Sequence, residues 1–417
     1  MRKISKISLV AAVAVAGFST ANAQPLEQAI KDVEVSGSVV YRYDNADNDK
    51  VQGASDRTDR NRYKIGLNLS SKVNDYVKFN SRFIVGGGDN TYGWATTDAK
   101  KGGDDKNASV DLSQAYFGLT AIPNTVVNIG KMGLTTPYTV AVDQNGNEQA
   151  GTGILALSTF GAVTAGAGYF NNQNFDTLPD INYSLGIKGS IIGFDGGNDV
   201  YVATLQGDLD LVKLESWYTG VQDTLNSYTL AATGNIDLAE NAKIGLEARY
   251  VNLKLDSDVQ DAHKLDSKDN SMFRLAADGK FSIVNARVAY TQTDKDGGLT
   301  ALDQDAKNTS LGWNITSNGV ADAKYWQAAL GADILDNLNF TLHYGNLEAD
   351  GSTERTLNHI FVGADQKLEQ EEVYGQLTYK MSKNLNTYLR YGNFQEKVDS
   401  VKDVDQDIGR IQVAYTF

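Results

Sequence analysis

The chain has 417 residues, no cysteine, 40 glycines, 21 tyrosines and a formal net charge of −14 at pH 7. Such acidity argues against binding to nucleic acid or, by charge, to an anionic membrane surface, and the absence of cysteine excludes disulfides and thiolate metal sites. A composition rich in glycine and tyrosine but free of cysteine is typical of outer-membrane β-barrels, in which tyrosines lie at the lipid–water interfaces.

The amino terminus predicts a secretory signal peptide over residues 1–23. The basic start contains Arg2, Lys3 and Lys6. The apolar run 7–18 follows, and Ala21-Asn22-Ala23 forms a small-x-small cleavage site. Removal of this peptide, which carries three cations and no acid, would take the formal charge from −14 to −17. No later apolar stretch approaches about 18 residues, so we expect no spanning helix.

Residues 24–417 read as a succession of strands of roughly ten residues, the length that crosses a membrane in a tilted β-barrel. In the first strand, Val35 and Tyr41 share one face, while Ser38 and Arg42 share the other. In a barrel wall, an apolar face contacts lipid and a polar face contacts a water-filled lumen.

The last ten residues, 408–417, repeat this pattern most clearly. Ile411, Val413 and Phe417 lie on one face, with Arg410 and Gln412 on the other. A soluble sandwich with this many strands would need two or three domains, and no linker or change of composition separates any. Closure into one barrel also removes the exposed sheet edges.

Short and long connections alternate along the chain, which predicts 18 antiparallel strands with short periplasmic turns and long outer loops. A count of 16 is also compatible with the pattern. The stretch 181–192 alternates like a strand, but it would break the rhythm, so we assign it to a hairpin arm within a long loop. The long loops are predicted near residues 45–62, 86–109, 132–151, 171–198, 222–226, 256–271, 294–322, 348–369 and 395–404.

The third long loop, 132–151, is predicted to fold into the lumen and form the pore constriction. Asp143 and Glu148 lie near its tip, with Asn145, Gly146 and Asn147 between them. The alternative interpretation is an ordinary solvated acidic loop, which the composition of the loop alone favours. The position of this loop as the third long one and the glycines that flank it favour the inward course.

A basic arc is predicted on the lumen wall, because five cations come from strands that must be neighbours when the barrel closes. An acidic loop facing such an arc would create a transverse field that orients dipolar solutes. Alternatively, each cation pairs with a private acid, such as Asp44, Glu34 or Glu372, and does not set selectivity. The five residues of the basic arc are Arg42, Lys64, Arg82, Arg390 and Arg410.

The sequence does not favour an enzyme or a cofactor site. The three histidines, His263, His343 and His359, are not part of any recognisable hydrolytic motif. The acid-rich segments 256–258, 294–298 and 403–405 superficially resemble calcium loops but lack the twelve-residue spacing and its final glutamate. We therefore expect no cofactor and no dedicated metal site, and adventitious binding of a divalent cation such as calcium stays open.

Several short motifs resemble the major outer membrane porins of campylobacter-type bacteria. These are the mature start 25–33 running into Tyr41-Arg42-Tyr43-Asp44, Gly130-Lys131 before the third long loop, Gly151-Thr152-Gly153 after it, and the terminal aromatic residue. The resemblance implies an 18-stranded trimeric porin of the outer membrane that passes small hydrophilic solutes and favours cations. The outer loops differ from the family pattern, so solute preference does not carry over.

Two functions of different classes follow. The first is a porin for passive diffusion of ions and small hydrophilic solutes, embedded in outer-membrane lipid as a homotrimer. It should be modestly cation-selective, because the acidic loops together with Asp143 and Glu148 should outweigh the basic arc. The alternative is a surface adhesin or receptor barrel whose long loops bind a host or a phage.

Overall fold

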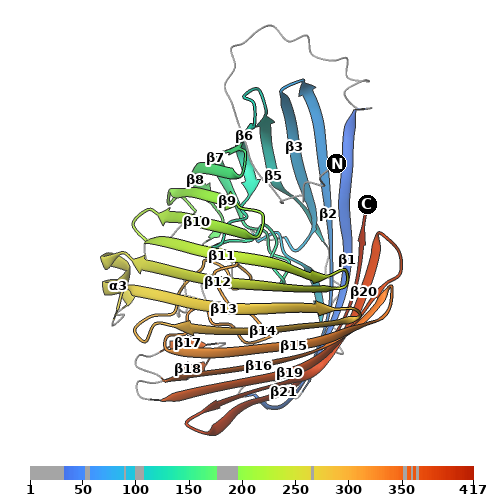
Figure 1. Cartoon of the computed structure of the whole chain (residues 1–417), viewed down its shortest axis with the longest axis vertical. Helices are drawn as coiled ribbons and strands as arrows, with labels where there is room; N and C mark the ends of the chain where they lie inside the picture. Colours follow the sequence, from blue (N-terminus) through green and yellow to red (C-terminus); the bar gives the residue numbers. More distant parts are fainter. Residues whose placement is uncertain are drawn as a thin grey trace.

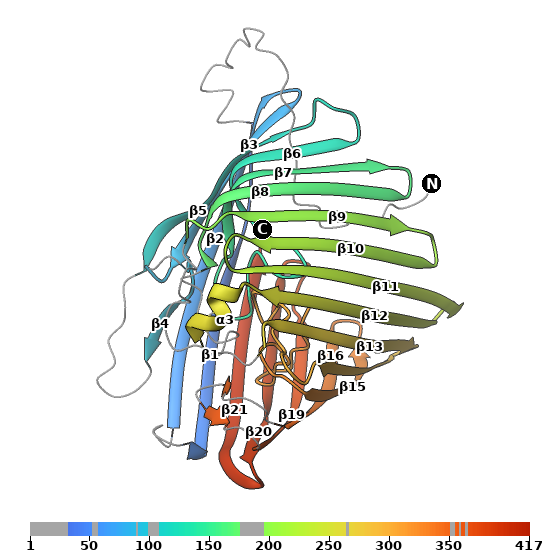
Figure 2. The same ribbon diagram turned by 90° about the vertical axis from the view of Figure 1, so that its left-hand side faces the viewer.

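The chain forms a closed antiparallel β-barrel of 18 strands, with one short extra strand, β4. The computed structural model describes residues 32–51, 57–88, 91–98, 108–175, 196–263, 267–350, 355–357, 360–362 and 366–417. Figures 1 and 2 show the strands following one another around the wall in chain order. The predicted fold class and strand count are thereby confirmed.

Each strand pairs with its neighbours in sequence, and β1 pairs with β21 to close the barrel. The barrel strands are β1 (Val33–Val51), β2 (Arg57–Asn74), β3 (Val77–Gly86), β5 (Ser109–Leu119), β6 (Thr125–Gly133), β7 (Ala150–Phe160), β8 (Val163–Gln173), β9 (Val200–Asp208), β10 (Val212–Val221), β11 (Leu225–Ala239), β12 (Ala242–Leu255), β13 (Asp269–Phe281), β14 (Val284–Thr293), β15 (Ala323–Leu335), β16 (Leu338–Asp350), β19 (Lys367–Lys380), β20 (Leu385–Val398) and β21 (Val401–Thr416).

The two faces of the wall follow the predicted alternation. On the last strand and the residue after it, Ile411, Tyr415 and Phe417 point outward and are 44%, 43% and 42% exposed. Arg42 of β1 pairs with Gln412 of β21 on the inner face. Large exposed apolar side chains on the outside and charged side chains inside are the inverse of a soluble protein, and they suit a wall between lipid and water.

The predicted loop 86–109 contains an additional strand, β4 (Ala95–Asp98). It pairs with Arg60–Tyr63 of β2, just beyond the part of β2 that pairs with β3. The long β2 would otherwise present unpaired backbone groups at that point, and β4 covers them.

Two of the predicted long loops are wrong in extent. Most of 45–62 belongs to β1 and β2, and most of 395–404 belongs to β20 and β21. A two-residue turn at Asp399 and Ser400, both with positive φ, joins β20 to β21, which is the geometry of a tight hairpin. The outer face of these strand ends is mostly polar because they extend past the lipid, and their apolar residues, such as Phe394 and Val398, point inward. Their sequence therefore resembles a loop. The acid-rich segment 403–405 accordingly lies on β21.

Other connections hold small elements of their own. The loop after β12 contains the helix α3 (Ser257–His263), and the loop after β16 contains a hairpin of β17 (Arg355–Leu357) and β18 (Ile360–Val362). The predicted signal peptide and the predicted hairpin arm 181–192 lie outside the described residues.

No helix in the described part of the chain is both long and apolar enough to cross a membrane.

Two loops fold into the barrel and give it an interior core. One joins β6 to β7 and the other joins β14 to β15; Figure 2 shows the second, coloured gold, inside the barrel. Leu134 and Tyr138 of the first loop and Leu302 and Ile315 of the second are buried. A cluster of apolar side chains joins Leu134 and Leu302 to Phe170 of the wall. The lumen is therefore partly filled by chain rather than open throughout.

Candidate functional site

The third long loop, residues 134–149, extends across the lumen from one wall to the opposite one. At its root, the hydroxyl of Tyr138 accepts a hydrogen bond of 2.9 Å from Thr229 of β11. At its tip, the carbonyl of Gln144 accepts a bond of 2.7 Å from Arg42 of β1, and that of Gly146 accepts one of 2.6 Å from Lys64 of β2. By strand order these two walls lie on opposite sides of the barrel.

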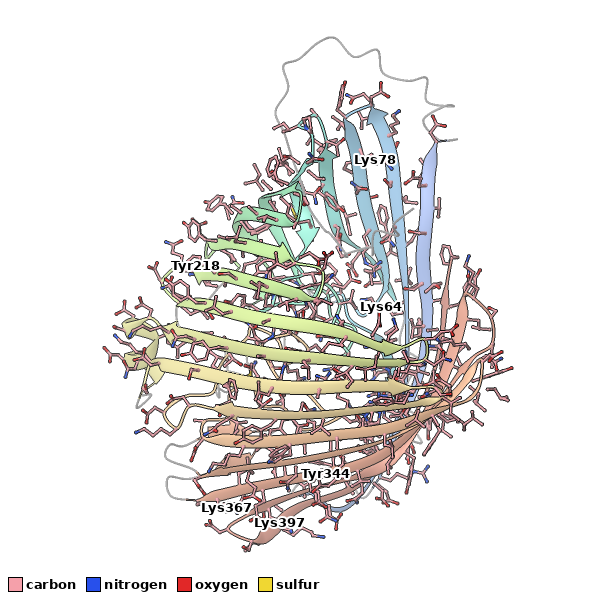
Figure 3. The ribbon with its side chains drawn as sticks, in the orientation of Figure 1. Lys64, Lys78, Tyr218, Tyr344, Lys367 and Lys397 are labelled. Carbon is pink, nitrogen blue, oxygen red and sulfur yellow. The ribbon has the colours of Figure 1, made fainter. Side chains whose placement is uncertain are left out.

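Glu148 binds two members of the predicted basic arc. Its Oε1 lies 2.8 Å from Lys64 Nζ and 2.8 Å from Arg82 Nη2. The Glu148 side chain is 1% exposed. Burial alone would raise the pKa of Glu148, but the hydrogen bonds from Arg82 and the charges of Lys64 and Arg82 hold it below its ordinary value. Figure 3 labels Lys64 on the inner side of β2.

Asp143, the other acid predicted at the tip, stabilises the turn of the loop. Its carboxylate accepts hydrogen bonds of 2.8 Å from the Asn147 backbone and 2.7 Å from the Asn147 side chain. Gly146 sits at the bend with a φ of +79°, and a Cβ there would collide with the Trp94 indole. The tip therefore has a fixed shape, with Asp143 buried within it.

The loop between β14 and β15, residues 294–322, forms the other half of the site, and its inward course was not predicted. The backbone N–H of its Leu302 donates a hydrogen bond of 2.9 Å to the carbonyl of Tyr138. The Oδ2 of its Asp305 accepts a hydrogen bond of 2.7 Å from the backbone N–H of Gln144. The side-chain amide of Gln149 also donates to Asp303. The two loops thus support each other inside the barrel.

Asp303 is an unusual carboxyl group, since it is fully buried between the two loops. Burial, and then the charge of nearby Asp143, raises the pKa of Asp303 to about 8. Burial also raises the pKa of Asp305. Asp303 consequently keeps its proton to a higher pH than an ordinary aspartate.

Arg390 of β20 lies directly opposite Arg410 of β21. The Arg390 guanidinium donates hydrogen bonds of 2.9 and 2.7 Å to Gln376. It also stacks at 4.9 to 5.4 Å from the ring centroids of three aromatic residues, an arrangement that stabilises a cation without a carboxylate. These are Trp313, Tyr374 and Tyr388.

The three acids predicted as partners of the arc bind different kinds of group. Asp44 receives a hydrogen bond from Arg410 and lies 3.6 Å from Arg62, a lumen cation that the sequence analysis missed. Glu34 pairs with Lys78. Glu372 accepts backbone N–H bonds of 2.8 Å from Trp313 and Asn314.

All five predicted cations therefore lie on adjacent strands, but only some have acid partners. Lys64, Arg82 and Arg410 have carboxylate partners, whereas within the described residues Arg42 and Arg390 form no ion pair with an acid. Arg42 instead contacts Gln412 and stacks on Trp94 at 4.6 Å. The arc thus combines cations that are paired with a carboxylate and cations that are not.

No group of three or more His, Asp or Glu side chains is placed to hold a metal ion anywhere in the described ranges. The acid-rich segment 294–298 is a loop in the structure, as expected, and 256–258 lies at the start of α3.

A closed wall of 18 strands with loops folded into a charged lumen defines a porin-like outer-membrane barrel. Solved structures share the fold. OccK5 (OpdH) of Pseudomonas aeruginosa has a TM-score of 0.69 at 16% identity, covering 93% of this chain and 98% of that one. OccAB3 of Acinetobacter baumannii has a TM-score of 0.71 at 14% identity, covering 93% and 99%. OprD of Pseudomonas aeruginosa has a TM-score of 0.67 at 16% identity, covering 93% and 94%.

The family of the chain is shown by sequence. The model of the Campylobacter major outer membrane protein family matches residues 1–417, so the chain belongs to that family and lies in the outer membrane. This confirms the resemblance seen in the sequence. No curated protein matches the chain.

Proposed function

We propose that the protein is a water-filled channel for passive diffusion of ions and small hydrophilic solutes, and not an enzyme. The observation that carries the proposal is the binding of the third loop to the basic arc. Because Glu148 is held by Lys64 and Arg82, the loop is fixed across the lumen and narrows it at one level. In wide barrels, selectivity depends on such a constriction.

The channel should be modestly cation-selective. Glu148 cannot contribute much to this, because Lys64 and Arg82 neutralise it. The preference instead rests on the excess of acids over the whole chain, which has 52 acidic and 38 basic residues. Their field acts over about 10 Å at 0.1 M salt. Arg42 and Arg390, which have no acid partner in the described structure, oppose it.

The experiment is a reversal-potential measurement on purified protein in a planar bilayer under a salt gradient. We expect discrete conductance steps and a small reversal potential whose sign indicates cation selectivity. The preference for cations should increase at low ionic strength. Neutralising Asp143 and Glu148 together (Asp143→Asn with Glu148→Gln) should move the reversal potential towards the anion side, because Lys64 and Arg82 then lose the charge that neutralises them. An anion-selective unmodified channel would show that the basic arc governs the pore.

We also infer a homotrimer. Small residues lie on the outer wall: Ala165 and Ala167 are exposed and Ala232 is half-buried. Ala232 and Ala248 line an apolar groove of about 600 Å³ between larger side chains such as Leu230. Small outward residues let neighbouring walls approach closely, and closed symmetry is the usual form of homo-oligomers. Crosslinking in native membranes should give a trimer, and a monomer under those conditions would refute the inference.

A further inference from the structure

We propose that the lumen contains a side pocket that binds small zwitterions with an apolar side chain, such as neutral amino acids, as they pass through the channel. The proposal rests on the proposed channel function and adds a solute class to it. It is carried by a cavity, an apolar wall and a pair of opposite charges that meet at one place.

The cavity lies against the inner wall of β7 to β10, beside the root of the third loop, and encloses about 130 Å³. A single ordered water needs roughly 10–15 Å³ of such space, so the cavity has room for several waters or for one small organic solute. By strand order it is on the opposite side of the barrel from the basic arc.

One side of the cavity is apolar and continues the interior core that the inward loops form with the wall. Leu155, Leu157, Phe170 and Val202 line it, together with Leu134 from the loop root. An apolar group of a solute that covers these side chains releases the water next to them, and this release favours binding. The wall therefore favours a solute that carries a branched aliphatic group over one that is polar throughout.

The other side of the cavity carries two opposite charges. Glu215 of β10 and Lys307 of the β14–β15 loop both line it, and Lys307 Nζ lies 3.4 Å from Glu215 Oε1. A second cation, Arg249, is 3.9 Å from Glu215 Oε2. Both distances exceed the roughly 2.7–2.9 Å of a strong charge-assisted hydrogen bond. The Lys307 side chain is 63% exposed, so it can turn towards a solute.

These charges match an α-amino acid. The ammonium group of the solute would donate a hydrogen bond to the carboxylate of Glu215, and the carboxylate of the solute would bind the ammonium group of Lys307. The side chain of the solute would enter the apolar part of the cavity. A purely anionic or cationic solute would satisfy one of the two groups and leave the other without its partner. The site should consequently prefer zwitterions to either singly charged analogue.

The test uses the full-length purified channel and leucine as the probe. In planar bilayers with KCl, leucine should reduce the current in a saturable way. Three controls should act only at much higher concentration: glycine lacks the aliphatic group, 4-methylpentanoate lacks the ammonium and 3-methylbutylamine lacks the carboxylate. Equal effects of leucine and the three controls would overturn the pocket.

Two variants and a matched control locate the effect. Lys307→Met and Leu157→Asn should each raise the half-saturating leucine concentration by roughly tenfold, the effect of losing one good interaction. Lys324→Met removes another partly exposed lysine, whose Nζ lies 3.8 Å from Asp350, and should leave the leucine response unchanged. A leucine response that is the same in all three variants would contradict the assignment.

A binding readout separates this proposal from the channel function. Trp217 lines the cavity, so leucine should change its fluorescence in detergent-solubilised protein, and Trp217→Phe should abolish that change. Conductance in KCl without a leucine-dependent fluorescence change would overturn the pocket and leave the channel standing. A fluorescence change without conductance would leave the pocket standing and refute the channel.

Discussion

Lys64 Nζ lies 2.8 Å from Glu148 Oε1, and both side chains are almost completely buried inside the barrel. This ion pair joins the wall strand β2 to a loop whose root is on the opposite wall. With Arg82 on the same carboxylate, it fixes the tip of the third loop against the basic arc. The acid predicted to face the arc across open water instead contacts it directly.

Loss of this carboxylate should therefore be costly. Glu148→Gln leaves Lys64 and Arg82 buried without a counter-charge, and breaking a buried pair in this way costs about 3–5 kcal/mol. The loss should appear in the free energy of unfolding measured with denaturant in detergent micelles.

The matched control for Glu148→Gln is Glu34→Gln. Glu34 pairs with Lys78 on the solvated surface, where the two side chains are 71% and 49% exposed. An exposed pair of this kind contributes about 0–1 kcal/mol. Similar losses from the two variants would show that the Glu148 pair does not anchor the loop.

Substitution of Gly146 should disturb the loop tip as much as substitution of Glu148, although Gly146 carries no charge. Its φ of +79° disfavours any side chain, and a Cβ would collide with Trp94. Gly146→Ala should displace the loop tip and change the single-channel conductance. Gly207→Ala is the control, because a Cβ at Gly207 meets open space. Its conductance should match that of the unmodified channel, and an equally unchanged Gly146→Ala would argue against a rigid tip.

The contact between the two inward loops should depend on pH through Asp303. The pKa of Asp303 is raised to about 8 when the loops are in contact, from an ordinary 3.8. At a pH between these two values, Asp303 is protonated when the loops are docked and ionised when they are apart. Docking should therefore weaken as pH rises from about 4 to about 8, by up to about 1.4 kcal/mol per pH unit, and change no further above that.

Groups facing Asp303 from the third loop are Asp143 and Gln149, and Asp305 lies beside it on its own loop. Current noise in single-channel records should rise across this pH window as the loops loosen. Asp303→Asn should make the noise independent of pH there. Noise that increases instead as the pH falls would show that another group controls the contact.

The wall of the barrel could be predicted from sequence because lipid imposes a period of two on every strand. Ile411 and Tyr415 alternate with Arg410 and Gln412, and that alternation alone places them on opposite faces. Beyond the lipid this constraint ends, so the strand ends near Asp399 could not be distinguished from a loop.

The interior of the barrel could be predicted only in part. The ordinal position of the third loop and its flanking glycines indicated an inward course, but the partners of Glu148 lie more than 60 residues away along the chain. The β14–β15 loop carried a signal that was not used. Leu299, Ile315 and Val320 are apolar residues that a solvated loop would not need, and all three are buried.

The most direct test of the account is the single-channel conductance of Lys64→Glu beside that of the unmodified protein. The substitution places a carboxylate next to Glu148 and should repel the loop tip from the basic arc. If the third loop forms the constriction, the variant will conduct more current, with more noise, than the unmodified channel. An unchanged conductance, in a variant whose barrel is folded, would contradict the claim that this loop limits the pore.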